Sequence, residues 1–343
     1  MNLVTGGTGL VGTHLILELL RSGRQVRALK RKQSDLSWIR KVFEFYEPEK
    51  GEAFFDRIMW VDADITDYYA LEEAFTGIDR VFHAAAIVSF NPRDRKQIMR
   101  VNRDGTRNMV NLALENNVRF FCFVSSVAAL GSQFRDGGYY VTETEEWKNS
   151  GDKPVYAVSK FYAEMEVWRA GEEGLPVAVV NPTVILGPGD WRRGSGTLFR
   201  RFSKGIPFYP TGSTGFVDVR DVSGIMMGLA EKNITGERFL LSSENMTFKK
   251  VFTLMAGAMG QKPPGVSVSP FMGGIAWRAD RMMSALTRKP HEVTRYSIQA
   301  SQRNVYYETS KIRDVLKYRF IPVKEAIENT ADFYKRMIIG AES

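Results

Sequence analysis

Three polar side chains of this 343-residue chain could form a proton-transfer site. Tyr156 and Lys160 are four residues apart, so on a helix they would share one face. A phenol with a pKa of about 10 exchanges protons poorly at neutral pH unless a nearby cation stabilises its phenolate, which Lys160 could do. Ser126 could hydrogen-bond the substrate oxygen on which charge develops. We therefore predict these three residues to be catalytic.

Position in the chain selects this pair, because the Tyr–Lys spacing alone is weak evidence. The same spacing occurs twice more, at Tyr46/Lys50 and Tyr307/Lys311. Only Tyr156 starts a helical pattern after an apolar strand, residues 120–124, whose end carries Ser125 and Ser126. Ligands of parallel sheets bind at the carboxyl ends of the strands. The competing interpretation is an ordinary helix with a surface lysine, and Ser125 is predicted to be structural.

A glycine-rich turn precedes the first helical pattern. Residues 5–12 read Thr-Gly-Gly-Thr-Gly-Leu-Val-Gly and lie between a short strand and an apolar stripe over residues 10–20. Gly6 would allow the tight turn, Gly9 the approach of a pyrophosphate, and Gly12 the packing of helix on strand. The first amides of the helix would face the phosphates. This context predicts a dinucleotide-binding site.

The end of the second strand favours NADP over NAD. NAD-binding folds usually place an Asp or Glu there for the ribose hydroxyl. Here residues 26–32 end in Lys30-Arg31-Lys32, and the first acid is Asp35. A guanidinium can bind a 2′-phosphate bidentately, whereas a carboxylate would repel it. The alternative is a solvated basic run.

The elements that must position these residues alternate strand and helix. Strands are expected at 26–29, 58–61, 80–82, 120–124 and 177–180, with helical patterns at 67–75, 95–115 and 156–169 between them. This alternation predicts an α/β fold: a Rossmann doubly wound parallel sheet with a smaller α/β C-terminal substrate-binding region. We expect residues 1–187 to form the NADP-binding core with the catalytic residues. Residues 188–343 would mainly bind substrate, with segment 215–243 returning to the core.

Composition is that of a globular protein with an uneven basic surplus. Apolar residues make up 44% and charged residues 25%, and the net charge is +8. Residues 21–41 contain eight basic residues against Asp35, so they carry +7 of this surplus. A second basic cluster comprises Arg192, Arg193, Arg200, Arg201 and Lys204. Neither cluster is interleaved with aromatics or forms a docking motif, so no nucleic-acid partner is expected.

Cysteine and histidine are too few for cross-links or metal cages. Cys122 is the single cysteine, so no intramolecular disulfide can form, and the three histidines have no metal-binding spacing. We expect no metal site and a reducing, cytoplasmic location. No apolar stretch of membrane-spanning length is present, so no integral membrane segment is expected.

On these motifs the chain resembles the extended short-chain dehydrogenase/reductases, the NAD-dependent epimerase/dehydratase family. Within that family it is more similar to the branch of dihydroflavonol reductase, cinnamoyl-CoA reductase and 3β-hydroxysteroid dehydrogenase than to sugar-nucleotide epimerases. Further stretches that carry the resemblance are 62–67, 83–86, 101–106, 181–188 and 216–222. One departure is Asn181, which replaces an arginine common in the epimerases.

The resemblance implies specific site residues. Ser126, Tyr156 and Lys160 fall on the family triad, and the residue at Arg31 contacts the 2′-phosphate of NADP in this branch. The implied cofactor contacts are Gly6, Thr8, Gly9, Leu10, Val11, Gly12, Lys30, Arg31, Asp64, Ile65, Ala84, Ala85, Asn102, Ser125, Tyr156, Lys160, Asn181, Pro182 and Val184.

The leading functional hypothesis is an NADP-dependent oxidoreductase that reduces a carbonyl or oxidises an alcohol, with Tyr156 as acid/base. The alternatives are an NAD-retaining nucleotide-sugar epimerase or dehydratase, and a non-catalytic protein that senses NADP. Pocket walls are expected from 87–90, the loop after Gly187 and 270–290. Their aromatics and methionines suit an apolar or aromatic ketone. Arg192, Arg193, Arg200 and Arg201 could receive an anionic tail such as a CoA or nucleotide phosphate, but a solvated basic surface is the favoured interpretation. A homodimer is possible.

Overall fold

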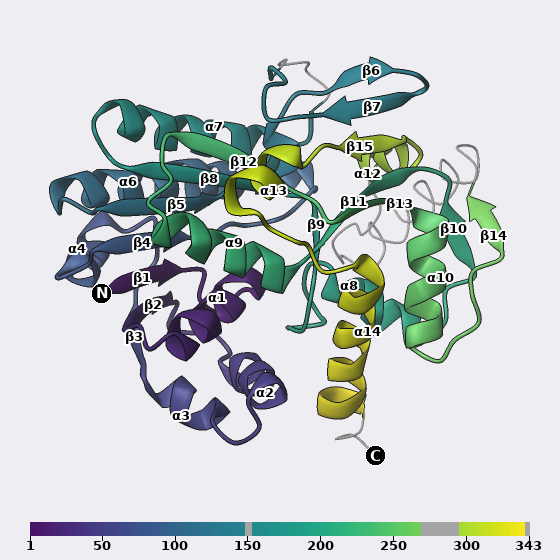
Figure 1. Cartoon of the computed structure of the whole chain (residues 1–343), viewed down its shortest axis with the longest axis horizontal. Coiled ribbons are helices and arrows are strands. Elements are labelled where there is room, and N and C mark those ends of the chain that lie inside the picture. Colours follow the sequence, from purple (N-terminus) through teal and green to yellow (C-terminus); the bar gives the residue numbers. More distant parts are fainter. Residues whose placement is uncertain (148–152, 269–294, 340–343) are drawn as a thin grey trace.

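The computed structural model describes residues 1–147, 153–268 and 295–339, and its centre is a parallel sheet of seven strands (Figure 1). The strand order is β3-β2-β1-β4-β5-β8-β12, so the chain winds outward from β1 in both directions. This topology confirms the predicted doubly wound fold. The strands are β1 (Asn2–Thr5), β2 (Val26–Lys30), β3 (Ile58–Asp62), β4 (Arg80–His83), β5 (Phe120–Val124), β8 (Val177–Pro182) and β12 (Glu237–Leu241).

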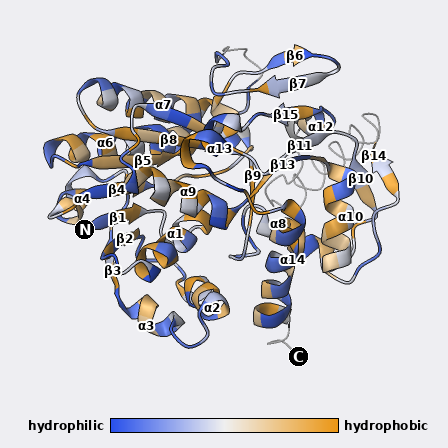
Figure 2. Ribbon diagram, viewed as in Figure 1, coloured by the Kyte–Doolittle hydropathy of each residue, from blue (hydrophilic) through white to orange (hydrophobic). Residues whose placement is uncertain are grey.

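Helices cover both faces of this sheet because its strands are apolar on both faces. In β5, Phe120 and Cys122 face one apolar cluster, while Phe121 and Phe123 face the other. The first face packs against α1 (Leu10–Arg21), α2 (Ser37–Tyr46), α3 (Gly51–Asp56), α9 (Val219–Glu231) and α13 (Ser310–Leu316). The second face packs against α4 (Tyr68–Phe75), α6 (Gly105–Glu115) and α7 (Val155–Glu172). Figure 2 shows the mixed hydrophilic and hydrophobic composition of these covering helices.

The helical pattern expected over residues 95–115 is interrupted in the structure. It consists of α5 (Arg95–Met99), a π-helical turn (Arg100–Asp104) and α6. A π-turn contains an extra residue and commonly occurs at functional sites. Here the turn contains the buried side chain of Asn102.

The C-terminal region contributes to three smaller sheets, two of which also contain strands from the first 187 residues. The first consists of β9 (Val184–Leu186), β11 (Ser213–Asp218) and β13 (Glu244–Thr247). The second pairs β10 (Phe208–Pro210) with β14 (Val266–Val268), and the third joins β6 (Gln133–Arg135), β7 (Gly138–Val141) and β15 (Val305–Tyr307). Its helices are α8 (Gly196–Phe202), α10 (Phe248–Ala258), α12 (Arg295–Ser301) and α14 (Val323–Tyr334). Short helical turns lie at Pro92–Asp94, Val127–Ala129 and Lys335–Ile339.

The chain returns from this region to the main sheet through two elements. Helix α9 packs against α1, and β12 pairs in parallel with β8. Strand β11, just before α9, belongs instead to the small sheet with β9 and β13. Segment 215–243 was expected to return to the core, but its first residues, in β11, belong to the small sheet. The proposed division at residue 187 stays a prediction.

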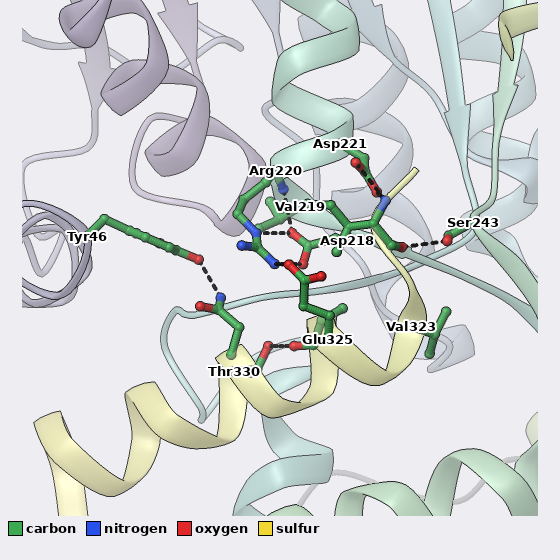
Figure 3. A network of polar contacts seen from close by, with 12 residues as sticks. Tyr46, Asp218, Val219, Arg220, Asp221, Ser243, Val323, Glu325 and Thr330 are labelled. Carbon is green, nitrogen blue, oxygen red and sulfur yellow. Dashed lines mark hydrogen bonds and ion pairs between the residues drawn. The ribbon is translucent and has the colours of Figure 1, made fainter. Parts of the chain in front are cut away.

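A network of charges joins the start of α9 to the C-terminal helix (Figure 3). We call Asp218, Arg220, Asp221 and Glu325 the α9–α14 network. The Arg220 guanidinium donates to both Asp218 oxygens, at 3.0 and 2.7 Å, and to Glu325 at 3.5 Å. Asp221 accepts from the backbone N–H of Ile321 at 3.1 Å and from the Tyr318 hydroxyl at 3.1 Å. The stretch 216–222, part of the family resemblance, therefore connects the main sheet to the C-terminal region.

Candidate active site

The predicted catalytic residues come together at the carboxyl end of β5. Ser126 is the second residue after this strand, and Tyr156 and Lys160 lie on the first turns of α7. The Ser126 hydroxyl accepts from the Ala128 backbone N–H at 3.1 Å, and its O–H remains available as a donor. Burial raises the pKa of Tyr156, and the Ser126 side chain acts to lower it. Phe90 packs edge-to-face on the Tyr156 ring, with 5.8 Å between ring centroids, so the expected wall segment 87–90 does adjoin the phenol.

Lys160 is buried beside them. Its side chain is 3% exposed, its Nζ donates to the Val124 carbonyl at 2.6 Å, and it lies 4.5 Å from the Phe123 ring centroid. Burial lowers the pKa of Lys160 to about 7, while the Glu164 carboxylate acts to raise it. Among the described residues, this carbonyl is the one hydrogen-bond partner of an ammonium that has three N–H groups. Two donors therefore remain for a ligand.

Glu164 is a functional candidate that the sequence did not single out. It lies one turn after Lys160 on α7 and is 1% exposed. Its carboxylate accepts from the Ser125 hydroxyl at 2.6 Å, the Asn181 amide at 3.0 Å and the Trp168 indole at 3.2 Å. The one available signal was its i+4 spacing from Lys160. Ser125, predicted to be structural, holds this carboxylate.

Asn181 also connects β8 to β5. Its amide nitrogen donates to the Ser126 carbonyl at 3.1 Å as well as to Glu164. Because both neighbours are acceptors, the amide nitrogen must face them, which fixes the orientation of this amide. Its Oδ1 is buried and has no hydrogen-bond partner within the described ranges. That oxygen is therefore available to accept a hydrogen bond from a bound group.

The glycine turn has the geometry expected of a phosphate-binding loop. Gly6 has a φ of +66°, and a Cβ there would lie 2.7 Å from the Ala85 backbone nitrogen. A Cβ on Gly12 would lie 2.2 Å from the Gly6 carbonyl oxygen. Gly9 is the N-cap of α1 and gives the helix no side-chain cap, so the first amides of the helix stay free for an anion. These features fit a dinucleotide pyrophosphate.

Two buried side chains position the backbone beside this turn. His83 bonds the hydroxyls of Thr5 at 2.6 Å and Thr106 at 2.9 Å, and burial lowers the pKa of His83 to about 3. Asn102 accepts from the Ile87 N–H at 2.7 Å and donates to the Ile87 carbonyl and the Ser159 hydroxyl. Both residues thus fix the segment containing Ala84 and Ala85. The cofactor contact expected at Asn102 stays a prediction.

Other expected cofactor residues lie around the same sheet end. Asp64 is exposed and accepts from the backbone and hydroxyl of Thr66, both at 2.8 Å. Ile65 is 6% exposed and packs in the core, and a Cβ on Gly105 would contact it at 2.7 Å. Pro182 ends β8 and Val184 begins β9, close to Asn181 in the chain.

Most of the basic stretch at residues 21–41 is paired in space. Arg21 bonds Glu18 and Glu47, and Arg27 bonds the last carbonyls of α4. Lys30 forms an ion pair with Asp62 at the end of the adjacent β3, an acid that the sequence alone did not place there. Within the described part of the chain, the exposed side chains of Arg31 and Lys32 have no ion pair. Arg31 therefore remains the available guanidinium at this strand end.

The second basic cluster is partly explained by pairing. Arg192 pairs with Asp190 at 2.8 Å and with Asp35 at 3.2 Å, and it lies 5.5 Å from the Trp38 ring centroid. Arg193 also pairs with Asp190, at 3.4 Å. These contacts join the loop after β9 to the loop before α2. Arg200 is an exposed residue of α8.

The expected substrate walls are described only in part. Segment 270–290, with Phe271, Met272 and Trp277, lies outside the described residues. Trp191 stacks on Tyr334 at 5.6 Å, inside the C-terminal apolar cluster, whereas Phe208 is 46% exposed. A hollow of about 580 Å³ lies at the opposite, amino end of the sheet, beside Arg24, Arg80 and Arg119, away from Tyr156.

Comparison with known proteins identifies the family of the chain. The model of the NAD dependent epimerase/dehydratase family matches residues 2–241, so the chain belongs to that family. A provisionally named dihydroflavonol 4-reductase from Synechocystis sp. is 28% identical over 341 residues, covering 97% of this chain and 94% of that protein. None of the helices in the described ranges is long and apolar enough to cross a membrane.

Solved structures share the fold over nearly the whole chain. The crystal structure of a protein designated gox2253 superposes with a TM-score of 0.80 at 27% identity and covers 98% of both chains. A UDP-glucose 4-epimerase from Thermus thermophilus, solved in complex with NAD, has a TM-score of 0.72 at 20% identity, covering 97% of this chain and 98% of that one. Members of this family are oxidoreductases or epimerases that use a nicotinamide cofactor, and reductases and epimerases thus share this architecture.

Proposed function

We propose that the protein is an NADP-dependent oxidoreductase that reduces a carbonyl, or oxidises the corresponding alcohol, with Tyr156 as acid/base. The observation that carries this proposal is the placement of Ser126, Tyr156 and the buried Lys160 together at the carboxyl end of β5, next to the glycine turn. A binding protein would need the glycine turn but not this proton-transfer group. The reductase-named relative supports the same reaction class.

Each side chain has a distinct task in this mechanism. When bound, the nicotinamide dinucleotide supplies or accepts the hydride. The Tyr156 phenol gives its proton to the carbonyl oxygen during reduction and takes it back during oxidation. Ser126 donates a hydrogen bond to that oxygen. Lys160, as an ammonium, stabilises the Tyr156 phenolate and uses its remaining N–H groups to hold the ribose.

The preference for NADP rests on Arg31. Its neighbour Lys30 is paired with Asp62, and Arg27 caps α4, so neither is free for a phosphate. We expect Arg31→Ala to weaken NADPH binding by about tenfold to a hundredfold and to leave NADH binding unchanged. The matched control is Arg24→Ala, in the same basic stretch, because Arg24 faces Glu231 instead. Equal losses for both cofactors, or tighter NADH binding by the wild type, would contradict this assignment.

Turnover with defined carbonyl compounds tests the reaction class. The purified full chain is mixed with NADPH and a panel of aldehydes, aromatic ketones and acyl-CoA thioesters, and loss of reduced nicotinamide is followed by absorbance. We expect at least one apolar or aromatic ketone to be reduced. No oxidation of NADPH, together with epimerisation of a UDP-sugar by protein that retains NAD, would replace the reductase by the nucleotide-sugar alternative.

The substrate class and setting are part of the proposal. Phe90 packs on the Tyr156 ring and is partly exposed, and Val88 two residues earlier is exposed too, which favours an apolar or aromatic substrate. The single cysteine, Cys122, is buried and unpaired, which suits a reducing cytoplasm. Tyr162 and Met165 are 41% and 37% exposed on α7, and they are candidates for a homodimer contact, which light scattering of the purified protein would detect.

A further inference from the structure

The mechanism above gives no role to the buried carboxylate next to the catalytic lysine. Removing a carboxylate from water is costly unless hydrogen bonds and an opposite charge replace the lost hydration. Glu164 has both: its three donors are described above, and the Arg238 guanidinium of β12 lies 3.4 Å from its Oε1. A surface helix position would not require such an environment. The burial and pairing of Glu164 therefore indicate a role for this carboxylate in the site.

The contacts of Glu164 reach both strand ends that form the site. Ser125 and Ser126 follow the last residue of β5, and Asn181 is the next-to-last residue of β8. Glu164 lies on the helix that carries Tyr156 and Lys160. The Asn181 amide bridges from the carboxylate to the Ser126 carbonyl. The Ser125 hydroxyl donates to the same carboxylate oxygen, Oε2. One oxygen atom thus connects three elements of the catalytic centre.

We propose that Glu164 is a positioning residue for the reaction: it clamps the ends of β5 and β8 to α7 and provides the negative charge that keeps Lys160 an ammonium. This inference rests on the proposed function for the roles of Ser126, Tyr156 and Lys160. Glu164 itself touches neither the phenol nor the reacting oxygen. It acts through Ser125, Asn181 and Lys160.

The charges around the pair support the electrostatic half of this proposal. Burial alone moves the pKa of Lys160 downward, and the Glu164 carboxylate opposes that shift. From β4, His83 faces Lys160, but it is neutral because burial holds its pKa at about 3. From β5, Lys160 meets the Val124 carbonyl and the Phe123 ring. The second cation, Arg238 of β12, faces Glu164. Glu164 is therefore the anion that sets the charge of Lys160.

A titration that needs neither cofactor nor substrate tests this charge effect. In full-length protein labelled with ε-¹³C lysine, the Lys160 resonance is identified by its loss in Lys160→Arg. We expect its midpoint, about 7 in the wild type, to fall by about one pH unit in Glu164→Gln and to be retained in Glu164→Asp. The control is Glu166→Gln on the same helix, whose carboxylate pairs with Arg169 at 3.2 Å. An unmoved midpoint in Glu164→Gln overturns the proposal.

Turnover tests the clamp separately. With the carbonyl compound that the wild type reduces fastest, we expect Glu164→Gln, Glu164→Asp and Ser125→Ala each to lower kcat by about tenfold or more and to change the NADPH dissociation constant less than about threefold. In Glu164→Gln, the alkaline limb of the kcat–pH profile should also move down by about one unit. Ser125→Ala, a small change, still tests the clamp if Glu164→Gln does not fold.

Unchanged kcat in Ser125→Ala and Glu164→Asp contradicts the clamp. A wild type that reduces nothing contradicts the proposed function, while the lysine titration still decides the role of Glu164.

Discussion

The α9–α14 network and the catalytic group, both within the described residues, differ in how completely their hydrogen-bonding groups are used. In the α9–α14 network, the buried carboxylate of Asp218 receives both arms of Arg220 and the Arg220 backbone N–H. Asp221 likewise accepts from Ile321 and Tyr318. In the catalytic group, Lys160 has one acceptor among the described residues, and Asn181 Oδ1 has no donor there.

This difference separates a structural motif from a ligand site. A network whose donors and acceptors are all paired gains no stability from a ligand. Unpaired donors and acceptors in a buried position destabilise the folded protein until a ligand pairs with them. Both clusters lie in stretches that resemble the family, so sequence resemblance alone does not distinguish their tasks. The four predictions below test the distinction by removing one group at a time.

The largest effect is expected at the Tyr156 phenol. Tyr156→Phe removes the proton donor, so kcat/KM should fall by about a thousandfold while the NADPH dissociation constant changes less than about threefold. Steady-state kinetics and a fluorescence titration with NADPH measure the two quantities. Tyr46→Phe is the matched control, because Tyr46 starts another pair with Tyr–Lys spacing and lies outside the site. Retained activity in Tyr156→Phe would remove this residue from the mechanism.

In the α9–α14 network the effect should fall on stability instead. Asp218→Asn leaves the half-buried Arg220 without its main counter-charge, and we expect a loss of about 3 kcal/mol in the free energy of unfolding. Urea denaturation measures this loss, and activity per folded molecule should be retained. The comparison pair is Lys324 and Glu328 on α14, an exposed ion pair whose removal should cost less than about 1 kcal/mol. Equal losses at the two positions would contradict the structural role.

The charge of Asp221 predicts a pH dependence of stability. Burial raises the pKa of Asp221 to about 7, well above that of an unfolded aspartate. The folded state therefore binds more protons than the unfolded state between about pH 4 and 7, so this group's contribution is present at low pH and declines as pH rises through 7. Relative to Asp221→Asn, the wild type should lose at most about 1.4 kcal/mol per pH unit across that window. If the free energy of unfolding varies with pH in the same way in the wild type and in Asp221→Asn, the titration of Asp221 does not contribute.

The smallest effect is expected where α2 meets α14. The Asn329 amide donates to the Tyr46 hydroxyl at 2.7 Å, so Tyr46→Phe should lower the free energy of unfolding by about 1 kcal/mol. Thermal melting of the variant beside Asn329→Ala and the double variant would measure it. Additive losses in the double variant would show that this hydrogen bond contributes nothing.

Much of the site was predictable because its signals are local. The glycine turn, the all-apolar strand before Ser126 and the helix that begins near Tyr156 each depend on a few consecutive residues, and the structure has these elements at the expected places. The parallel order of the sheet follows from the alternation of strands and helices. Helix α9 begins at Val219 because the Asp218 side chain caps it by accepting from the Arg220 N–H, a local signal of the same kind.

What could not be predicted depends on strand register and on contacts between distant segments. Lys30 meets Asp62 only because β2 pairs with β3 in one register. Glu164 meets Arg238 only because β12 returns beside β8. The π-turn around Asn102 was also missed, because a single extra residue per turn leaves the apolar periodicity of 95–115 almost unchanged.

The late return of β12 has a consequence for synthesis of the protein. Until residues 237–241 have left the ribosome, β8 is an unpaired edge strand of the sheet. Exposed edges of apolar strands can pair with strands of other chains and promote aggregation. Arg238 arrives on the same strand, so the ion pair of Glu164 also forms late. The nascent chain therefore carries its whole glycine turn and catalytic helix while the sheet beneath them still lacks its last strand.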